Sequence, residues 1–232
     1  MSIWFRMGEY VSAAATQALS AVVESVRTVF EGDPLTRRHV GFSIAMIALS
    51  AKMAKADGIV TSEEVEAFQE LFEVPESEAE NVARVYNLAK RDVSGFDGYA
   101  NRIRQLFPDD SEILRDVLDG LFHIAKADGL VHELEMNFID EVAKVLGIGE
   151  GELERIRLRH LHPEDGNPYL LLGADPAWDD KTLKRHYRKL VADNHPDRMI
   201  ARGVPEEFLK ISNDRLACIN KVWAHIRAER DL

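Results

Sequence analysis

The sequence predicts an all-α protein, in which a helical bundle built on a repeated helix–turn–helix unit is followed by a smaller helical module. Two observations predict this fold class. Apolar residues recur at helical spacing along most of the chain, and a six-residue turn sequence occurs twice, each time directly after an apolar helix. No segment has the pattern of a convincing strand. The 232 residues, 46% of them hydrophobic and 30% charged, suffice for one large globular domain or two small ones.

The charge of the chain limits its functions. The net charge is −11, which argues against nonspecific binding of nucleic acid by the whole chain. Residues 1–166 hold 17 Lys and Arg against 30 Asp and Glu, whereas residues 167–232 hold 12 against 10. The single cysteine, Cys218, excludes an internal disulfide framework and fits a reducing compartment such as the cytoplasm. Cys218 stands among apolar residues, which favours a small buried side chain over a nucleophile.

Residues 1–32 are predicted to form an N-terminal amphipathic helix, with apolar residues at helical spacing from 8 to 30 and a stop at Gly32-Asp33-Pro34. One interpretation is peripheral contact of residues 1–30 with the inner membrane surface. Packing on the protein's own body or on a second subunit is favoured, because the polar face lacks the Lys and Arg typical of interfacial helices. No stretch approaches about 18 uninterrupted apolar residues, so we expect no transmembrane helix and a cytoplasmic location.

Residues 33–150 contain the repeat. The sequence Lys-Ala-Asp-Gly-Ile-Val at 55–60 recurs as Lys-Ala-Asp-Gly-Leu-Val at 126–131. An apolar helix precedes each copy, at 42–54 and at 113–125, and an acidic helix start follows each. In each turn the glycine allows the positive φ at which a helix can end, and the aspartate can bond backbone groups. The pattern therefore predicts two helix–turn–helix units related by a pseudo-two-fold axis.

Further helices are predicted between and after the two copies. The spacing of apolar residues predicts helices at 77–91 and 96–107, and Gly147 ends the last helix of the bundle. The glycines at 147–151 look like a phosphate-binding loop, but they follow a helix and no Lys-Ser/Thr pair comes after them, so a helix stop is favoured. Residues 151–166 are predicted to be a short helix and a linker. A pair of histidines there lacks the further Cys or His that a metal site needs.

The doubled turn pattern resembles the TerB family, named for tellurite resistance. The matching residues are Asp57, Gly58, Val60 and Glu64, then Asp128, Gly129, Val131 and Glu135. The resemblance covers about half the chain and makes the four acids candidate ligands of a hard, oxygen-preferring cation. The alternative, which we favour, is that these acids cap turns and helix N-termini, so no metal and no cofactor is predicted. An EF-hand is excluded, because Phe68 stands where its bidentate glutamate is required.

Residues 167–232 form a second unit, in which a short helix from Pro168 to a stop at Gly173 precedes a helix predicted at 179–193. The longer helix has two contrasting faces. Its apolar face consists of Leu183, Tyr187, Leu190 and Val191, and its opposite face of Lys181, Lys184, Arg185, Arg188 and Lys189. Solvent-exposed faces usually mix charges of both signs, so five cations without an acid suit docking on an acidic partner.

The tripeptide His195-Pro196-Asp197 ends this helix, because proline removes a backbone donor and restricts the residue before it. Residues 198–204 are predicted to be a loop and residues 206–227 a long last helix. Its inward face is predicted to consist of Phe208, Ile211, Leu216, Ile219, Val222, Trp223 and Ile226. Two antiparallel helices joined at this loop can bury one shared core and leave the basic face free.

This unit resembles the J domain of the DnaJ co-chaperone family. The matches, in order, are Asn167-Pro168-Tyr169, Leu171-Leu172-Gly173, Tyr187-Arg188-Lys189-Leu190, His195-Pro196-Asp197 and Ile219-Asn220-Lys221-Val222-Trp223. The combination is specific, although the family's usual fourth helix is nearly absent and no Gly/Phe-rich or Cys-rich zinc module is present. A TerB-like domain followed by a terminal J domain is the arrangement of the DjlA-type proteins. Those proteins typically begin with a membrane-spanning segment, which we do not expect here.

The J-domain resemblance implies a function. The chain would dock on an ATP-bound heat-shock chaperone of the DnaK type and stimulate its ATPase without being an enzyme itself. The residues that match the family's partner-binding positions are Lys184, Arg188, Lys189, His195, Pro196 and Asp197. The TerB-like domain would then recognise an unknown client or partner protein. The alternative function is a metal-ion or stress-ion binding protein of the TerB type with an accessory J domain.

Overall fold

The computed structural model describes residues 34–56, 62–71, 74–91, 95–108, 110–161, 166–202, 206 and 209–232. In these residues all regular structure is helical and no strand occurs, which confirms the predicted fold class. The N-terminal helix predicted at 1–32 lies outside the described residues. None of the helices in the described part of the chain combines the length and the apolar character that crossing a bilayer requires.

Each copy of the repeated sequence stands between two helices, which form one repeat unit with it. The helices of the two units are α3 (Pro34–Ala56) with α4 (Ser62–Leu71), and α7 (Ser111–Ala125) with α8 (Glu133–Leu146). In the turn of the second unit Gly129 has a φ of 96°, and the Asp128 carboxylate accepts a hydrogen bond of 3.0 Å from the backbone N–H of Leu130. The roles predicted for this glycine and this aspartate are thus confirmed. The turn of the first unit, at 57–61, lies outside the described residues.

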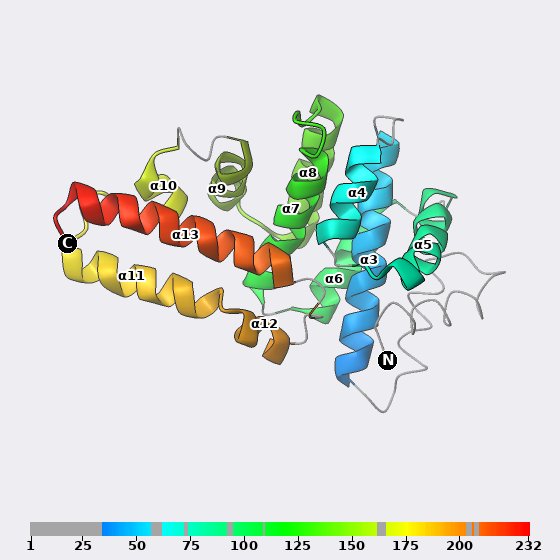
Figure 1. Cartoon of the computed structure of the whole chain (residues 1–232), viewed down its shortest axis with the longest axis horizontal. Helices are drawn as coiled ribbons and strands as arrows, with labels where there is room; N and C mark the ends of the chain where they lie inside the picture. Colours follow the sequence, from blue (N-terminus) through cyan, green and yellow to red (C-terminus); the bar gives the residue numbers. More distant parts are fainter. Residues whose placement is uncertain are drawn as a thin grey trace.

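Helix α3 runs through the middle of the bundle. From residue 40 to residue 54 every position except Lys52 is buried, because α5 (Ala79–Arg91), α6 (Phe96–Leu106), α7 and α8 all contact this helix (Figure 1). A helix enclosed in this way is apolar on all faces. Its two buried serines bond within the helix, since the Ser50 hydroxyl donates to the Met46 carbonyl at 3.0 Å. A short 3-10 helix, Glu76–Glu78, leads into α5.

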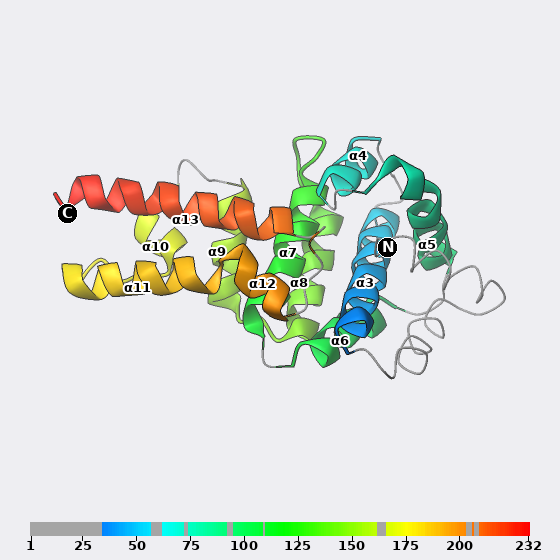
Figure 2. The same ribbon diagram turned by 60° about the horizontal axis from the view of Figure 1, so that its bottom comes forward.

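The C-terminal part of the chain forms a second, smaller group of helices beside α9 (Glu150–Leu161), which packs on α7. These helices are α10 (Pro168–Leu172), α11 (Asp180–Asp193), α12 (Pro196–Arg202) and α13 (Leu209–Glu229). Helices α11 and α13 lie side by side and extend away from the bundle in both views (Figures 1 and 2). Together with α10 they bury Tyr169, Leu172, Leu183, Ile219, Val222, Trp223 and Ile226. This is the shared core that the sequence predicted for the two antiparallel helices.

The segment after His195 differs from the prediction. The loop predicted at 198–204 is wrong as far as residue 202, since Pro196–Arg202 is the helix α12, and residues 203–205 lie outside the described residues. Proline is well suited to the first position of a helix, where its missing N–H has no partner to lose. The His195 carbonyl accepts hydrogen bonds from the backbone N–H groups of Arg198 and Met199, at 2.9 and 3.3 Å. Burial of Met199, 1% exposed, in the core of the bundle holds the short helix in place.

The inward face of α13 differs from the predicted face in one described position. Leu216 is only partly buried, and Phe208 lies outside the described residues. The buried positions in the first half of the helix include two polar residues, Ser212 at 1% and Arg215 at 5% exposure. The inward face follows the helical spacing as expected, but the prediction rested on apolar residues and therefore did not include Arg215.

Candidate partner-binding site

Helix α11 is fixed at its start and along its apolar face. The Asp179 carboxylate caps the helix by accepting a hydrogen bond of 2.7 Å from the backbone N–H of Thr182. The Tyr187 ring stacks on Trp223 of α13, with 4.7 Å between ring centroids, and its hydroxyl donates to Asn220 Oδ1 at 3.0 Å. These contacts set the rotation of α11 on α13 and turn its basic face outward.

The ends of the helices farthest from the bundle are joined by Arg230. Its Nε donates to the Tyr169 hydroxyl of α10 at 2.8 Å, and its Nη1 donates to the Trp178 carbonyl before α11 at 2.8 Å. His186 of α11 adds a second link to α10, with 2.9 Å between its Nε2 and the Leu172 carbonyl oxygen. The helices α10, α11 and α13 are therefore held together by side chains as well as by their shared core.

The basic face of α11 is available to a partner. Four of its five cations are exposed and Lys184 is half-buried; the exposed ones are Lys181, Arg185, Arg188 and Lys189. Within the part of the chain that the structure describes, none of the five takes part in an ion pair. Such a surface attracts an acidic partner by long-range electrostatics and forms its ion pairs only on contact.

His195-Pro196-Asp197, the loop between α11 and α12 whose last two residues form the start of α12, presents an exposed acid. The side chain of Asp197 is 88% exposed and that of His195 is 53% exposed, with 3.6 Å between His195 Nδ1 and Asp197 Oδ2. The Asp197 backbone N–H also donates to the same Nδ1 at 3.3 Å. Two buried residues flank the loop, Asn194 at 2% and Met199 at 1% exposure. The three predicted loop residues are thus brought next to the basic helix, with the carboxylate directed to solvent.

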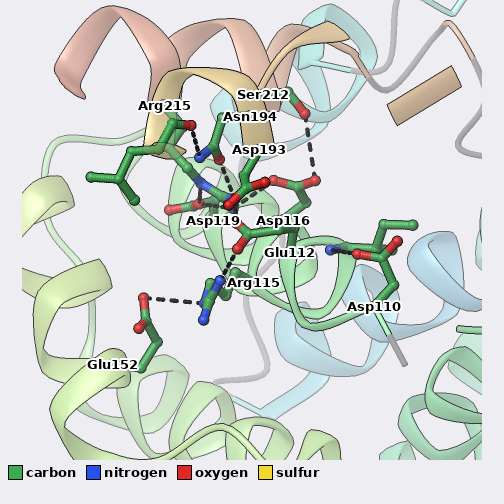
Figure 3. A network of polar contacts seen from close by, with 12 residues as sticks. Asp110, Glu112, Arg115, Asp116, Asp119, Glu152, Asp193, Asn194, Ser212 and Arg215 are labelled. Atoms are coloured by element: carbon green, nitrogen blue, oxygen red, sulfur yellow. Dashed lines mark hydrogen bonds and ion pairs between the residues drawn. The ribbon is translucent and has the colours of Figure 1, made fainter. Parts of the chain in front are cut away.

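Two residues outside the sequence prediction, Arg215 and Asn194, support this loop on the side that faces the bundle. Arg215 of α13 donates through Nη1 to Asn194 Oδ1 at 3.1 Å, and through Nε to Asp119 Oδ2 of α7 at 2.7 Å (Figure 3). Its Nη2 lies 2.5 Å from Asp116 Oδ1. The sequence contains a signal for this acidic face, because Glu112, Asp116 and Asp119 follow one another at helical spacing on a helix whose other residues are mostly apolar.

Asp119 is the centre of the charges in this network. Its Oδ1 lies 2.6 Å from Arg159 Nη2 and 2.7 Å from His160 Nε2, both on α9. Burial raises the pKa of Asp119, but Arg159, Arg215 and the hydrogen bond from His160 together lower it well below its usual value. Burial lowers the pKa of His160, although the hydrogen bond and the charge of Asp119 act to raise it. The carboxylate of Asp119 thus stays ionised and joins α7, α9 and α13.

The candidate cation ligands of the repeat have other roles in the second unit. Asp128 bonds its own turn, and the Glu135 carboxylate accepts a hydrogen bond of 2.9 Å from the backbone N–H of His132 at the start of α8. Asp57 and the side chain of Glu64 lie outside the described residues. Within the described ranges, no group of three or more His, Cys, Asp or Glu residues could hold a metal ion. The capping alternative therefore describes the two acids of the second unit.

The bundle can be compared with known protein families. Residues 43–158, half of the chain, match the family described as "Tellurite resistance protein TerB". The chain belongs to the TerB family. The matched stretch runs from α3 to α9, so the acidic helix α7 and its partner Arg159 on α9 belong to or directly adjoin the TerB domain, whereas α10 to α13 follow it.

Relatives extend over most of the chain. "Co-chaperone protein DjlA" of Vibrio parahaemolyticus serotype O3:K6 is 24% identical over 229 residues, which cover 85% of this chain and 81% of that protein. The DjlA protein of Photobacterium profundum is 25% identical over 219 residues, covering 83% and 79%. That of Coxiella burnetii is 25% identical over 200 residues, covering 78% and 74%. The similarity to the DjlA-type proteins is confirmed. No solved structure matches the chain significantly.

Proposed function

We propose that this chain is a J-domain co-chaperone that recruits a DnaK-type heat-shock chaperone and stimulates its ATPase. The observation that carries the proposal is the exposed Asp197 on a supported loop directly after the acid-free basic face of α11. The relatives that align with most of the chain are named co-chaperones, which supports the same role. The J-domain resemblance supplies the identity of the partner.

The geometry suits docking followed by signalling. The cations of α11 provide steering and contacts at the rim of an interface, where each ion pair contributes little free energy but the set fixes the orientation. The loop then brings the Asp197 carboxylate against the chaperone and shifts it toward the state that hydrolyses ATP. This is coupling between two sites, in which the chain supplies no group that attacks ATP.

The first test removes the charge of Asp197. Asp197→Asn keeps the size of an exposed side chain, so the helix content and the unfolding temperature should stay unchanged. Stimulation of a purified DnaK-type ATPase, measured in single turnover at saturating co-chaperone, should fall to the unstimulated rate. The exposed Asp175→Asn in the turn before α11 is the matched control and should stimulate as the wild type does. Full stimulation by Asp197→Asn would refute the proposed mechanism.

The second test reverses a charge on the docking face. Arg188→Glu should raise the Kd for the chaperone at least tenfold, since a repelling acid replaces a contact in a cationic cluster. Wild-type affinity should also weaken as salt is raised from about 50 to 300 mM, because salt screens exposed charges. Arg91→Glu, on α5 at the other side of the bundle, is the control (Figure 1). Equal loss of affinity in both variants would show that only net charge matters.

We further propose that the TerB domain recognises the client. It contributes two exposed leucines at the turn of the second unit, Leu130 at 70% and Leu134 at 53% exposure. Pairs of exposed apolar side chains suit contact with unfolded segments of a client. The double variant Leu130→Ser/Leu134→Ser should bind reduced, carboxymethylated α-lactalbumin, a permanently unfolded probe, several-fold more weakly while its ATPase stimulation stays intact. Unchanged probe binding would place client recognition elsewhere.

A further inference from the structure

Arg215 joins the C-terminal helices to the TerB domain through a buried contact. Its side chain is 4% exposed and faces three carboxylates of α7, those of Asp119, Asp116 and Glu112. The two aspartate side chains are 4–5% exposed, so water does not screen these ion pairs. A buried arginine with such partners is costly to expose, because separation would leave uncompensated charge on both sides. The buried ion pairs therefore favour contact between the C-terminal helices and the TerB domain.

The same guanidinium also reaches the signalling loop. While Nε and Nη2 hold Asp119, Nη1 donates to Asn194 Oδ1 at 3.1 Å. Asn194 is the last residue before His195, and its side-chain amide donates to the Leu190 carbonyl at 2.8 Å. One planar group thus connects an acid of α7 to the residue that ends α11 (Figure 3). Nε and Nη2 both donate to the single oxygen Oδ2 of Asp119 while Nη1 is directed to Asn194, and lysine cannot reproduce this fixed planar array of donors.

A second contact beside Arg215 holds the other end of the loop. Met199 of α12 and Ile211 of α13 are buried in the core of the bundle rather than in the core shared by α11 and α13. Ile211 approaches α7 so closely that a Cβ added to Gly120 would lie 3.1 Å from its Cδ1. The loop is therefore attached to the TerB domain on both sides, by a polar contact before it and an apolar contact after it.

The contact between the C-terminal helices and the TerB domain leaves the proposed chaperone-binding surface exposed. Arg188 and Lys189 remain exposed on α11, and the Asp197 side chain is 88% exposed. The contact with the TerB domain thus supports the loop without covering it. A buried polar network that only stabilised the fold would not need to reach the residue next to the loop.

We propose that Arg215 and Asn194 are positioning residues, which couple the acidic face of α7 to the loop His195-Pro196-Asp197 and so make the TerB domain part of the signalling device. This inference deepens the proposed function and rests on it. The TerB domain then does more than recognise a client: it sets the position from which Asp197 contacts the chaperone. A change on α7 is transmitted to the loop through one side chain.

The test separates docking from signalling in the full-length chain. Asn194→Ala removes the contact to the loop and leaves the Arg215–Asp119 ion pair in place. In a titration of a DnaK-type chaperone, its half-saturating concentration should stay within about twofold of wild type, because the basic face is intact, while the maximal stimulation falls at least threefold. Arg215→Lys should lower maximal stimulation in the same way. Asp214→Asn, an exposed acid adjacent to Arg215, should behave as wild type.

Amide hydrogen exchange provides a readout that does not depend on the chaperone. Measured relative to the protection of α3 in the same variant, protection of residues 194–202 should fall in Asn194→Ala and also in Asp119→Asn, although Asp119 does not touch the loop. Wild-type stimulation and wild-type protection in Asn194→Ala and Arg215→Lys would overturn the inference. If the wild-type chain does not stimulate the ATPase, the proposed function fails. The coupling between α7 and the loop is refuted separately if hydrogen exchange at 194–202 is unchanged in Asp119→Asn.

Discussion

Asp116 and Asp119 lie on the same buried face of α7, yet their pKa values are shifted in opposite directions. Burial raises the pKa of Asp116 to about 7, since the attraction of Arg215 does not outweigh burial and the nearby carboxylates of Asp119 and Glu112. The pKa of Asp119 lies well below its usual value, because Arg159 and Arg215 act together on it. Arg215 therefore stabilises the ionised form of Asp119, whereas burial favours the protonated form of Asp116.

This difference predicts opposite effects of two amide substitutions. The folded chain holds a proton on Asp116 up to about pH 7, whereas the unfolded chain releases it near pH 4, so the contribution of Asp116 to stability falls as pH rises through this window. Asp116→Asn should raise the free energy of unfolding at pH 8, with a gain that shrinks toward pH 4. Urea denaturation followed by circular dichroism at both pH values measures the change.

Asp119→Asn should instead destabilise the chain at neutral pH by roughly 3–5 kcal/mol, because it removes one partner from a buried charge network. The ionised carboxylate contributes stability above the unfolded pKa near 4, and this contribution is lost only as pH falls below that value. The same denaturation experiment serves for both variants. A loss of stability in Asp116→Asn equal to that in Asp119→Asn would contradict the opposite pKa shifts of the two carboxyl groups.

At the scale of elements, two glycines within helices occupy opposite environments. Gly98 in α6 has open space where a Cβ would be, whereas a Cβ at Gly120 in α7 would lie 3.1 Å from Ile211 and 3.3 Å from Met46. Glycine in a helix is less stable than alanine because it loses more conformational entropy on folding. This cost is offset only where a larger side chain would not fit. Gly120 thus allows α13 to approach α7 closely enough for Arg215 to reach Asp119.

The two glycines give a matched prediction. Gly98→Ala should stabilise the chain by about 0.5–1 kcal/mol, because alanine favours the helix and meets nothing. Gly120→Val should destabilise it by roughly 1–3 kcal/mol through overpacking at the contact of α7 with α13. Gly98→Val, the control for a β-branched side chain in a helix, should change stability by less than Gly120→Val does. Guanidinium denaturation at pH 7 would show whether the order holds.

At the scale of the whole molecule, the two hydrophobic cores are joined rather than independent. The smaller core lies between α10, α11 and α13, but the first turn of α13 and the short helix α12 contribute Ile211 and Met199 to the core of the bundle. The ion pair of Arg215 with Asp119 spans 96 residues of sequence at the same junction. Loss of either core would expose buried charge in the other part of the chain.

The wild-type chain should therefore unfold in one cooperative transition in differential scanning calorimetry. Arg215→Gln should broaden or split this transition, because the smaller core then loses its polar link to the bundle, and Asp214→Asn should keep it single. Two separate transitions in the wild type would show that the parts unfold independently.

The sequence alone determined most of the described helices and the exposed residues of the proposed site. Apolar spacing at 179–193 located the two faces of α11, glycine and aspartate chemistry identified the turn at 126–131, and the order of short motifs indicated the J-domain resemblance. These features depend on neighbours a few residues apart in the chain, so their physical causes are local. The helix at 196–202 was missed because its stability comes from burial of Met199 in a distant core.

Only the tertiary structure decided what supports the loop. Arg215 and Asn194 are polar residues without a recognisable motif, and their significance comes from Asp119, which lies 96 positions from Arg215. A charge pattern along the chain cannot reveal which acid faces which base, because that depends on how α13 packs on α7. The sequence therefore indicated the residues proposed to meet a partner, and the packing of the helices determined which residues hold them in place.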